Sequence, residues 1–142
     1  MNMRTNRRRV RVEFGDCDPA EIVYYPKYFS WLDQSTHYLF ESAGIIWREL
    51  PDRWGIQAPL VDAHARFISP AIWGDDLEIE SRIERWGDRS FVIAHRVLNA
   101  ASGECIVEAT ETRVCVKLNP DAPKKITAVS VPEAIKQAFQ VA

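Results

Sequence analysis

The sequence predicts an α+β fold in which an antiparallel sheet packs against one long helix. The segment 26–43 carries apolar side chains at helical spacing, whereas the later segments alternate apolar and polar residues with the period of two of β-strands. Those later segments follow one another with only short turns between them, as consecutive strands do in an antiparallel meander. One helix laid on one such sheet is a layered α+β architecture.

The first strand is predicted where Val10, Val12 and Phe14 alternate with polar residues. Five arginines lie within the first eleven residues of the chain. Such a basic segment could contact phosphate, but we interpret it as a frayed terminus leading into an edge strand. The strand should end at the turn 15–19, which contains glycine, proline and two aspartates.

The long helix is predicted to begin at Pro26 and to run to about residue 43, with Gly44 as a left-handed cap. One apolar stripe on it starts at Tyr28, and a second stripe is interrupted by Asp33. A helix that is apolar on two faces packs against its own sheet with one face and against something else with the other. A carboxylate on that second face lies either at a solvated rim or in a ligand site.

The remaining elements follow from the same periodicities. A short helical segment is expected within 45–54 and a terminal helix within 132–139. The strands are expected at 58–67, 77–84, 90–99 and 104–117.

Length and composition indicate one globular domain covering residues 1–142, with 46% hydrophobic and 27% charged residues. The formal net charge of −2 favours neither nucleic acid nor a membrane surface as a partner. We expect no membrane span, because the apolar stretches fall short of about 20 residues. Cys17, Cys105 and Cys115 match neither a disulfide framework nor a metal motif, so we expect a reducing, cytoplasmic setting.

The acidic turn and the start of the helix together have the chemistry of acyl transfer. The first N–H groups of a helix are unpaired, and because Pro26 has none, the Tyr25 N–H is the better donor to a carbonyl oxygen. A carboxylate opposite that carbonyl could attack it or take a proton from water. The alternative is that Asp16 or Asp18 only closes the turn with its side chain.

The segment 12–35 resembles the signature of the 4-hydroxybenzoyl-CoA thioesterase family, whose members have the hot-dog fold. The shared features are Phe-Gly-Asp-Cys-Asp-Pro-Ala at 14–20, Ile-Val at 22–23, an aromatic pair with proline at 24–26, Tyr28, and Trp-Leu-Asp at 31–33. Weaker similarity continues at 67–70, 74–76 and 86–91. The resemblance therefore covers most of the chain.

The resemblance implies an acyl-CoA thioesterase that hydrolyses an aryl- or medium-size acyl-CoA without a metal or cofactor. It implies a sheet wrapped around the central helix, and homotetramers built as dimers of dimers with active sites between subunits. Asp18 would be the nucleophile or general base, and the Tyr25 N–H would polarise the thioester carbonyl. Asp33 of the partner subunit would face the distal end of the acyl group, with Tyr24 as a further substrate contact.

Two departures from the family pattern concern substrate binding. Glu21 stands where the family has glycine, and it either lines the pocket or points to solvent. The basic cluster that the family uses for CoA phosphates is reduced here to Arg89. Nearby cations at 82, 85, 124 and 125 could substitute for it. An acyl carrier protein would present the same pantetheine arm, so it stays open as the alternative carrier.

Other candidates are weaker. His64 could line the cleft, although a hydrogen-bonded structural histidine fits its strand better, and the histidine spacing does not predict a metal site. We interpret Cys17 as a packed small residue, and most of the five tryptophans as core or interface, with one or two flanking an aryl group. The alternative functions are a hot-dog hydratase or dehydratase and a non-catalytic acyl-CoA-binding protein.

Overall fold

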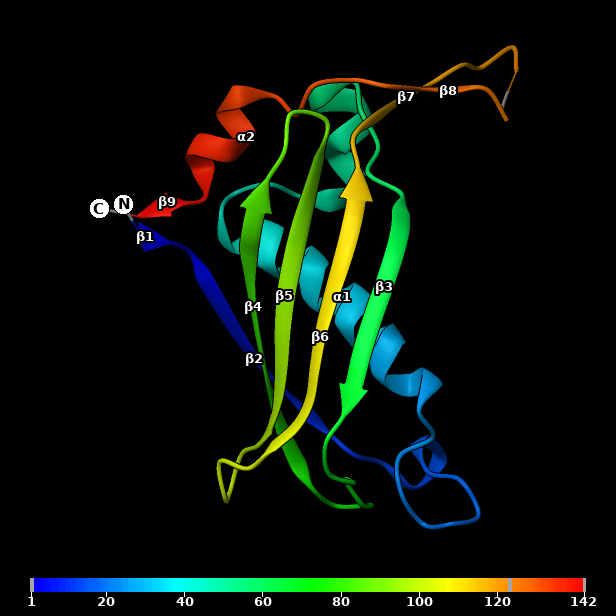
Figure 1. Cartoon of the computed structure of the whole chain (residues 1–142), viewed down its shortest axis with the longest axis vertical. Helices are drawn as coiled ribbons and strands as arrows, with labels where there is room; N and C mark the ends of the chain where they lie inside the picture. Colours follow the sequence, from blue (N-terminus) through cyan, green and yellow to red (C-terminus); the bar gives the residue numbers. More distant parts are fainter. Residues whose placement is uncertain (1, 123, 142) are drawn as a thin grey trace.

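A five-stranded antiparallel sheet, with one long helix lying across one of its faces, forms the centre of the molecule (Figure 1). The computed structural model describes residues 2–122 and 124–141. The helices and strands, in chain order, are β1 (Asn2–Met3), β2 (Thr5–Arg11), η1 (Phe14–Asp16), α1 (Pro26–Ser42), η2 (Trp47–Glu49), the π-helical turn η3 (Leu50–Trp54), β3 (Leu60–Phe67), β4 (Asp76–Trp86), β5 (Ser90–Asn99), β6 (Cys105–Val114), β7 (Val116–Leu118), β8 (Ile126–Ala128), α2 (Glu133–Ala138) and β9 (Gln140–Val141).

The main sheet has the strand order β2-β4-β5-β6-β3, and every neighbouring pair is antiparallel. β4, β5 and β6 pair in chain order, as a meander does. β3 precedes them in the chain but lies at one edge of the sheet beside β6, and β2 forms the other edge. The predicted α+β class, with one long helix on an antiparallel sheet, is confirmed.

Helix α1 begins and is capped where the sequence predicts. Pro26 is its first residue, a position where a missing N–H costs nothing. Gly44, just past its end, has a φ of 84°, a left-handed conformation that glycine adopts without a steric penalty. The stripe that starts at Tyr28 is buried, whereas Asp33 on the second stripe is half-buried. The helix therefore presents one face to its own sheet and keeps a carboxylate at the border of the other.

The first strand differs from the prediction. β2 begins at Thr5 and ends at Arg11, so Phe14 falls in η1 and is 72% exposed instead of lying in a strand. All seven residues of β2 pair with β4. The basic segment is thus a paired edge strand from Thr5 onward and not a frayed terminus.

Opposite charges explain why an arginine-rich segment forms a strand. Arg7 lies directly across from Glu80, with 2.9 Å between Nε and a carboxylate oxygen, and Arg9 lies across from Glu78 at 3.8 Å. Oppositely charged pairs across two strands contribute about 0.2–1 kcal/mol each. Because these pairing partners are distant in sequence, only the structure shows that the strand extends back to Thr5.

Arg8 points to the other face of β2 and fastens it to helix α1. Its guanidinium donates to the Ser35 hydroxyl at 2.7 Å and to the Trp31 carbonyl at 3.0 Å, and lies 5.0 Å from the ring centre of Tyr38. This arginine is therefore bound to the helix and is not a free phosphate contact.

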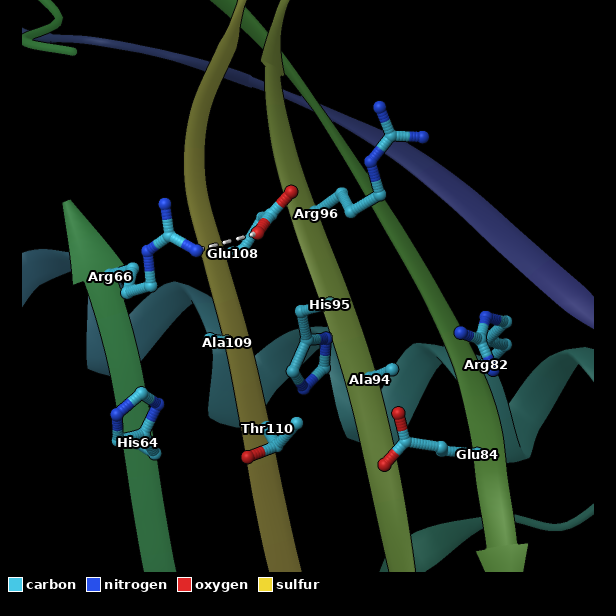
Figure 2. A pocket seen from close by; sticks show the side chains of 10 residues that line it. All are labelled: His64, Arg66, Arg82, Glu84, Ala94, His95, Arg96, Glu108, Ala109 and Thr110. Atoms are coloured by element: carbon cyan, nitrogen blue, oxygen red, sulfur yellow. Dashed lines mark ion pairs between the residues drawn. The ribbon is translucent and has the colours of Figure 1, made fainter. Parts of the chain in front are cut away.

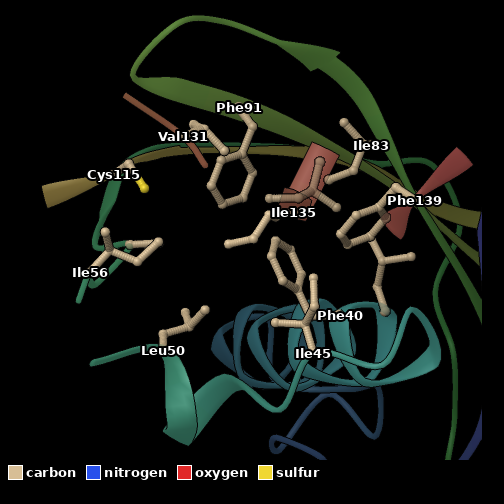
Figure 3. Packing of buried hydrophobic residues seen from close by; sticks show 13 residues of the cluster. Phe40, Ile45, Leu50, Ile56, Ile83, Phe91, Cys115, Val131, Ile135 and Phe139 are labelled. Carbon is tan, nitrogen blue, oxygen red and sulfur yellow. The ribbon is translucent and has the colours of Figure 1, made fainter. Parts of the chain in front are cut away.

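The apolar core consists of two clusters, one under each half of α1. Phe40 lies at the centre of the cluster under the C-terminal half, with its ring 4.8 Å from that of Phe139 and 5.5 Å from that of Phe91 (Figure 3). Leu32 anchors the other cluster and is also fully buried. Burying a side chain of this size stabilises the fold by about 1.5–3 kcal/mol.

A buried polar layer, formed by Thr36, Ser81, His95 and Glu111, lies on the helix-facing side of the sheet. Ser81 Oγ is 2.7 Å from His95 Nδ1, and His95 Nε2 is 3.3 Å from a Glu111 carboxylate oxygen. The Thr36 hydroxyl of α1 donates to that same oxygen. Burial alone would raise the pKa of Glu111, but the bonds from His95 and Thr36 and the charge of Arg113 hold it below its ordinary value.

The C-terminal segment closes one end of the core. Ile135 of α2 inserts into the cluster around the helix's C-terminal half (Figure 3), and β9 pairs antiparallel with β1, so the two ends of the chain lie together (Figure 1). The predicted terminal helix is confirmed. Within residues 2–122 and 124–141, no helix is both long and apolar enough to cross a membrane.

Candidate active site

The acidic turn that precedes α1 is a tight β-hairpin. Cys17 and Val23 face each other across it as an antiparallel bridge. The Asp18 N–H donates to the Ile22 carbonyl at 2.9 Å, and the Glu21 N–H donates back to the Asp18 carbonyl at 2.8 Å. The proline after Asp18 suits the second position of such a turn, because its ring fixes φ. The hairpin thus holds the Asp18 backbone in one position.

Glu21 occupies a backbone position that favours glycine. Its φ is 70°, and among the described residues it is the one non-glycine with a positive φ. Three-residue hairpin loops commonly end in such a left-handed residue, which costs a residue with a Cβ about 1–2 kcal/mol. The structure therefore supplies a physical reason for the glycine in the related family. The Glu21 side chain is exposed and lines the same cavity as Asp18.

Replacing Glu21 by glycine should stabilise the protein. The Glu21→Gly variant relieves the left-handed strain but gives the unfolded chain more freedom, so we expect a net gain of about 0.5–1 kcal/mol. That corresponds to a rise of about 2–4 °C in the midpoint of thermal unfolding. The Glu21→Ala variant is the control, because it removes the charge but keeps the Cβ. A gain of equal size in both variants would contradict the backbone explanation.

The two acids of the turn have different surroundings. Both oxygens of Asp16 are engaged: one accepts the Glu13 N–H at 2.8 Å, and the other lies 3.7 Å from the Lys27 ammonium. Asp18 accepts the Ala20 N–H with Oδ1 at 2.9 Å, which is the turn-closing contact that the sequence left open. No hydrogen bond to the second oxygen of Asp18 is found within residues 2–122 and 124–141. Asp18 therefore keeps a carboxylate oxygen for a ligand, whereas Asp16 has a structural role.

The Tyr25 N–H is unpaired in the part of the chain that the structure describes. The neighbouring donors are all engaged: the Tyr24 N–H bonds the Asp16 carbonyl at 2.8 Å, and the Lys27 N–H bonds the Tyr24 carbonyl at 2.9 Å. Pro26 has no N–H to offer. Tyr25 is the cap residue of α1, where the helix dipole favours a developing negative charge. The structure thus leaves one free amide donor just before the helix.

A cavity of about 650 Å³ lies beside Asp18, a volume in the range of small-molecule sites. Its walls come from the hairpin and from a second loop, which contributes Trp73. Trp73 and Phe14 pack edge to face with ring centres 5.3 Å apart, yet they are 61% and 72% exposed. Exposed aromatic pairs of this kind mark contact sites. Trp73 is thus the tryptophan that lines the cavity beside Asp18, which is the position expected for one that flanks an aryl group.

Tyr25 borders a different, more apolar cavity of about 330 Å³, with Tyr28, Phe67 and neighbouring residues. The Tyr25 ring packs against Phe67 of β3, and Tyr24 packs on Tyr25 with ring centres 5.7 Å apart. Asp33 lines neither this cavity nor the one at Asp18. A single chain therefore places the Asp18 carboxylate and Tyr25 at two adjoining cavities, and Asp33 away from both.

Asp33 forms an ion pair that the sequence analysis missed. Its Oδ1 lies 2.7 Å from Nη2 of Arg113 on β6, and its Oδ2 lies 3.9 Å from His37 Nε2, one helical turn away. Burial lowers the pKa of His37 in spite of the Asp33 charge, so His37 is neutral near pH 7. The arginine, and not the histidine, balances Asp33. The sequence did contain a signal for this pair: β6 carries the charged residues Glu111 and Arg113 at inward-facing positions, where apolar residues are expected.

Arg89 and His64 lie away from the hairpin. Arg89 lies in the turn between β4 and β5, at the opposite end of the sheet from the hairpin (Figure 1), and its Nε is 3.5 Å from the Asp88 carboxylate. His64 is exposed on β3 and faces a charged cavity of about 320 Å³ on the side of the sheet that faces away from α1 (Figure 2). A single chain therefore does not bring either residue to Asp18.

Metal-ligating clusters and disulfides are also informative. Among the described residues, no group of three or more His, Cys, Asp or Glu side chains is placed to hold a metal ion. The three cysteines are free, and Cys17 is half-buried in the hairpin with its thiol 3.8 Å from the Glu13 carbonyl.

Comparison with known proteins assigns the chain to a family. The sequence profile of the thioesterase-like superfamily matches residues 12–139. The chain belongs to this superfamily. It is 35% identical over 127 residues to the 4-hydroxybenzoyl-CoA thioesterase of Pseudomonas sp. (strain CBS-3), covering 86% of this chain and 88% of that protein. The predicted family and the predicted thioester hydrolase are thereby confirmed.

Solved structures of thioesterases show the same fold. An aspartate-to-asparagine mutant of 4-hydroxybenzoyl-CoA thioesterase, complexed with 4-hydroxybenzoyl-CoA, superposes with a TM-score of 0.87 at 33% identity, covering 96% of this chain and 99% of that one. A gentisyl-coenzyme A thioesterase superposes with a TM-score of 0.79 at 30% identity, covering 95% and 100%. This chain thus has the expected hot-dog fold, with the antiparallel sheet around its central helix.

Proposed function

We propose that this thioesterase hydrolyses aryl-CoA esters to the free acid and CoA, with Asp18 and the Tyr25 N–H as its catalytic groups. One observation carries the proposal. Within one short segment, Asp18 in the hairpin keeps a free carboxylate oxygen and Tyr25, two residues after the hairpin, keeps a free N–H, and each group borders one of two cavities. The relatives that act on 4-hydroxybenzoyl-CoA and gentisyl-CoA support an aryl group as the acyl part.

In the proposed reaction the thioester carbonyl oxygen accepts a hydrogen bond from the Tyr25 N–H. Negative charge develops on that oxygen in the transition state, where the donor and the helix dipole stabilise it. Asp18 then acts in one of two ways. It attacks the carbonyl carbon to form an anhydride that water hydrolyses, or it takes a proton from the water that attacks. In both routes the C–S bond breaks and CoA leaves as a thiolate, a good leaving group for which a carboxylate suffices.

We propose that the active unit is a homo-oligomer, a dimer of dimers, in which Asp33 of the partner subunit faces the distal end of the acyl group. The outer edge of β3 has no neighbouring strand within the described residues. Apolar side chains on and next to this edge are exposed, among them Val61 and Phe67 at 59% and 49%. An unpaired edge with exposed apolar residues is a surface that proteins cover by association. The Tyr25–Phe67 contact places the helix start beside this edge.

Arg89 is the proposed contact for the CoA phosphates. Arg89 is exposed, and its pairing with Asp88 at the surface is weak enough for a phosphate to displace. Its distance from the hairpin within one chain means that it would serve a site completed by another subunit, as would His64 at its exposed position, whereas Tyr24 lies next to the hairpin and would contact substrate within the same chain. The free thiols fit the cytoplasmic setting proposed for such an enzyme.

A panel of acyl-CoA esters tests the function. We expect thiol release, followed with a free-thiol reagent, from 4-hydroxybenzoyl-CoA, benzoyl-CoA and phenylacetyl-CoA, and faster release than from short-chain acetyl-CoA. Sedimentation under assay conditions should show a multiple of the 16.3 kDa chain. Binding of the esters without any thiol release would instead support a non-catalytic acyl-CoA-binding protein. Release only from acyl carrier protein thioesters would replace CoA as the carrier.

A further inference from the structure

A buried arginine stands behind the half-exposed Asp33. The Arg113 side chain is 6% exposed, whereas the Asp33 side chain is 51% exposed. Arginine is among the residues least often buried without a partner, so its position needs a reason. The two residues are 80 positions apart in the chain and come from α1 and β6. Their contact is therefore a feature of the tertiary fold and not of local sequence.

Three contacts besides Asp33 fix the guanidinium in place. Its Nη1 donates to the Ala58 carbonyl at 3.1 Å, its Nε lies 3.7 Å from the Glu111 carboxylate, and its central carbon lies 5.0 Å from the ring centre of Trp47. Glu111 is itself held by the buried polar layer. Because the guanidinium is a rigid planar fork, these contacts also determine where Nη2 points.

This arrangement locks one oxygen of Asp33 and leaves the other available. Nη2 holds Oδ1 at 2.7 Å. In the part of the chain that the structure describes, Oδ2 accepts no hydrogen bond and has only the neutral His37 at 3.9 Å. A carboxylate on an exposed helix face would otherwise rotate freely, and fixing it in advance lowers the entropy that a ligand loses on binding.

We infer that Arg113 is a positioning residue that fixes Asp33 as the acceptor for a hydroxyl or amino group at the distal end of the acyl substrate. This inference rests on the proposed function, which places Asp33 at the distal end of the acyl group, and it adds Arg113 as the residue that holds Asp33 there. A carboxylate accepts hydrogen bonds and donates none, so an unsubstituted ring gains nothing from it. A site built to bond a hydroxyl discriminates strongly against the analogue that lacks it, because its polar group is then left unpaired.

The test compares two esters that differ by one hydroxyl. For the wild-type enzyme we expect kcat/KM to be larger for 4-hydroxybenzoyl-CoA than for benzoyl-CoA. In the Arg113→Met variant this ratio should fall at least tenfold, while kcat/KM for benzoyl-CoA changes less than threefold. The Arg113→Lys variant keeps the charge but not the fork, so it should restore part of the ratio. The double variant Glu111→Gln with Arg113→Met avoids an uncompensated buried carboxylate and should show the same loss.

The matched control is Arg8→Met. Arg8 also contacts α1 from the sheet, through Ser35 and Trp31, but it does not contact Asp33. Its substitution should leave the ratio of the two esters unchanged. Suppose that the wild type is active and that both variants carrying Arg113→Met keep its ratio of kcat/KM for the two esters, or that the ratio falls equally in Arg8→Met. Either result would overturn the positioning role of Arg113 and leave the proposed function standing. No thiol release from either ester by the wild type would overturn the proposed function itself, and this inference with it.

Discussion

Replacing Asp18 by asparagine is expected to lower thiol release from an aryl-CoA by about three orders of magnitude or more. An amide can neither attack the thioester carbon nor take a proton from water, so both proposed routes are lost. The fold should be unaffected, because the asparagine oxygen can still accept the Ala20 N–H that Asp18 Oδ1 accepts at 2.9 Å. Single-turnover kinetics with 4-hydroxybenzoyl-CoA, together with thermal unfolding and sedimentation, would measure both parts.

Asp16→Asn is the matched control for this variant. Asp16 lies two residues away in the same hairpin, but its oxygens cap the Glu13 N–H and pair with Lys27. We expect its substitution to reduce turnover less than tenfold and to cost some stability at the hairpin. Turnover by Asp18→Asn above a tenth of the wild-type value would contradict the catalytic role. An equal loss in both variants would mean that the hairpin's shape, and not the Asp18 carboxylate, limits the reaction.

The backbone donor can be removed by a proline at position 25. Tyr25 has a φ of −55°, within the range that proline imposes, and its N–H bonds nothing in the described chain. The Tyr25→Pro variant therefore deletes the donor at small cost to the fold. Removing one donor of this kind typically slows the reaction by roughly 10²–10³-fold.

The Tyr25→Ala variant separates the side chain from the amide. It loses the same ring contacts with Phe67 and Tyr24 but keeps the N–H. We expect kcat of Tyr25→Ala to stay within about tenfold of the wild type and kcat of Tyr25→Pro to lie roughly 10²–10³-fold below it. Equal kcat values for the two variants, at equal stability, would show that this amide does not stabilise the transition state.

Much of the fold follows from local sequence signals. The start and cap of α1 depend on Pro26 and Gly44, and β4 depends on the alternation of apolar and polar residues, so their positions are predictable. β2 was missed in part because Val10 is the one apolar residue among its seven, so the strand has no apolar period. The long strand predicted at 104–117 is divided because the Cys115 N–H turns to the Arg89 carbonyl at 2.7 Å. Such a tertiary hydrogen bond leaves no local signal.

Some features of the candidate site are likewise predictable from local sequence, whereas others depend on the tertiary structure. Asp18 and Tyr25 lie within one short segment, for which turn chemistry and helix-start rules predict Tyr25 as the donor but leave Asp16 and Asp18 both open as the acid. The distinction between Asp16 and Asp18 needed the structure, because it depends on which oxygens are already bonded. The Asp33–Arg113 pair joins residues from two elements far apart in sequence, and only the packing of α1 on β6 brings them together.

A crystal structure of the Asp18→Asn protein with 4-hydroxybenzoyl-CoA would test the central claim most directly. The account predicts that the thioester carbonyl oxygen lies about 2.7–3.1 Å from the Tyr25 nitrogen. It also predicts the new carboxamide on the opposite side of the carbonyl carbon. A thioester bound with its carbonyl directed away from the Tyr25 N–H, or out of reach of position 18, would contradict it.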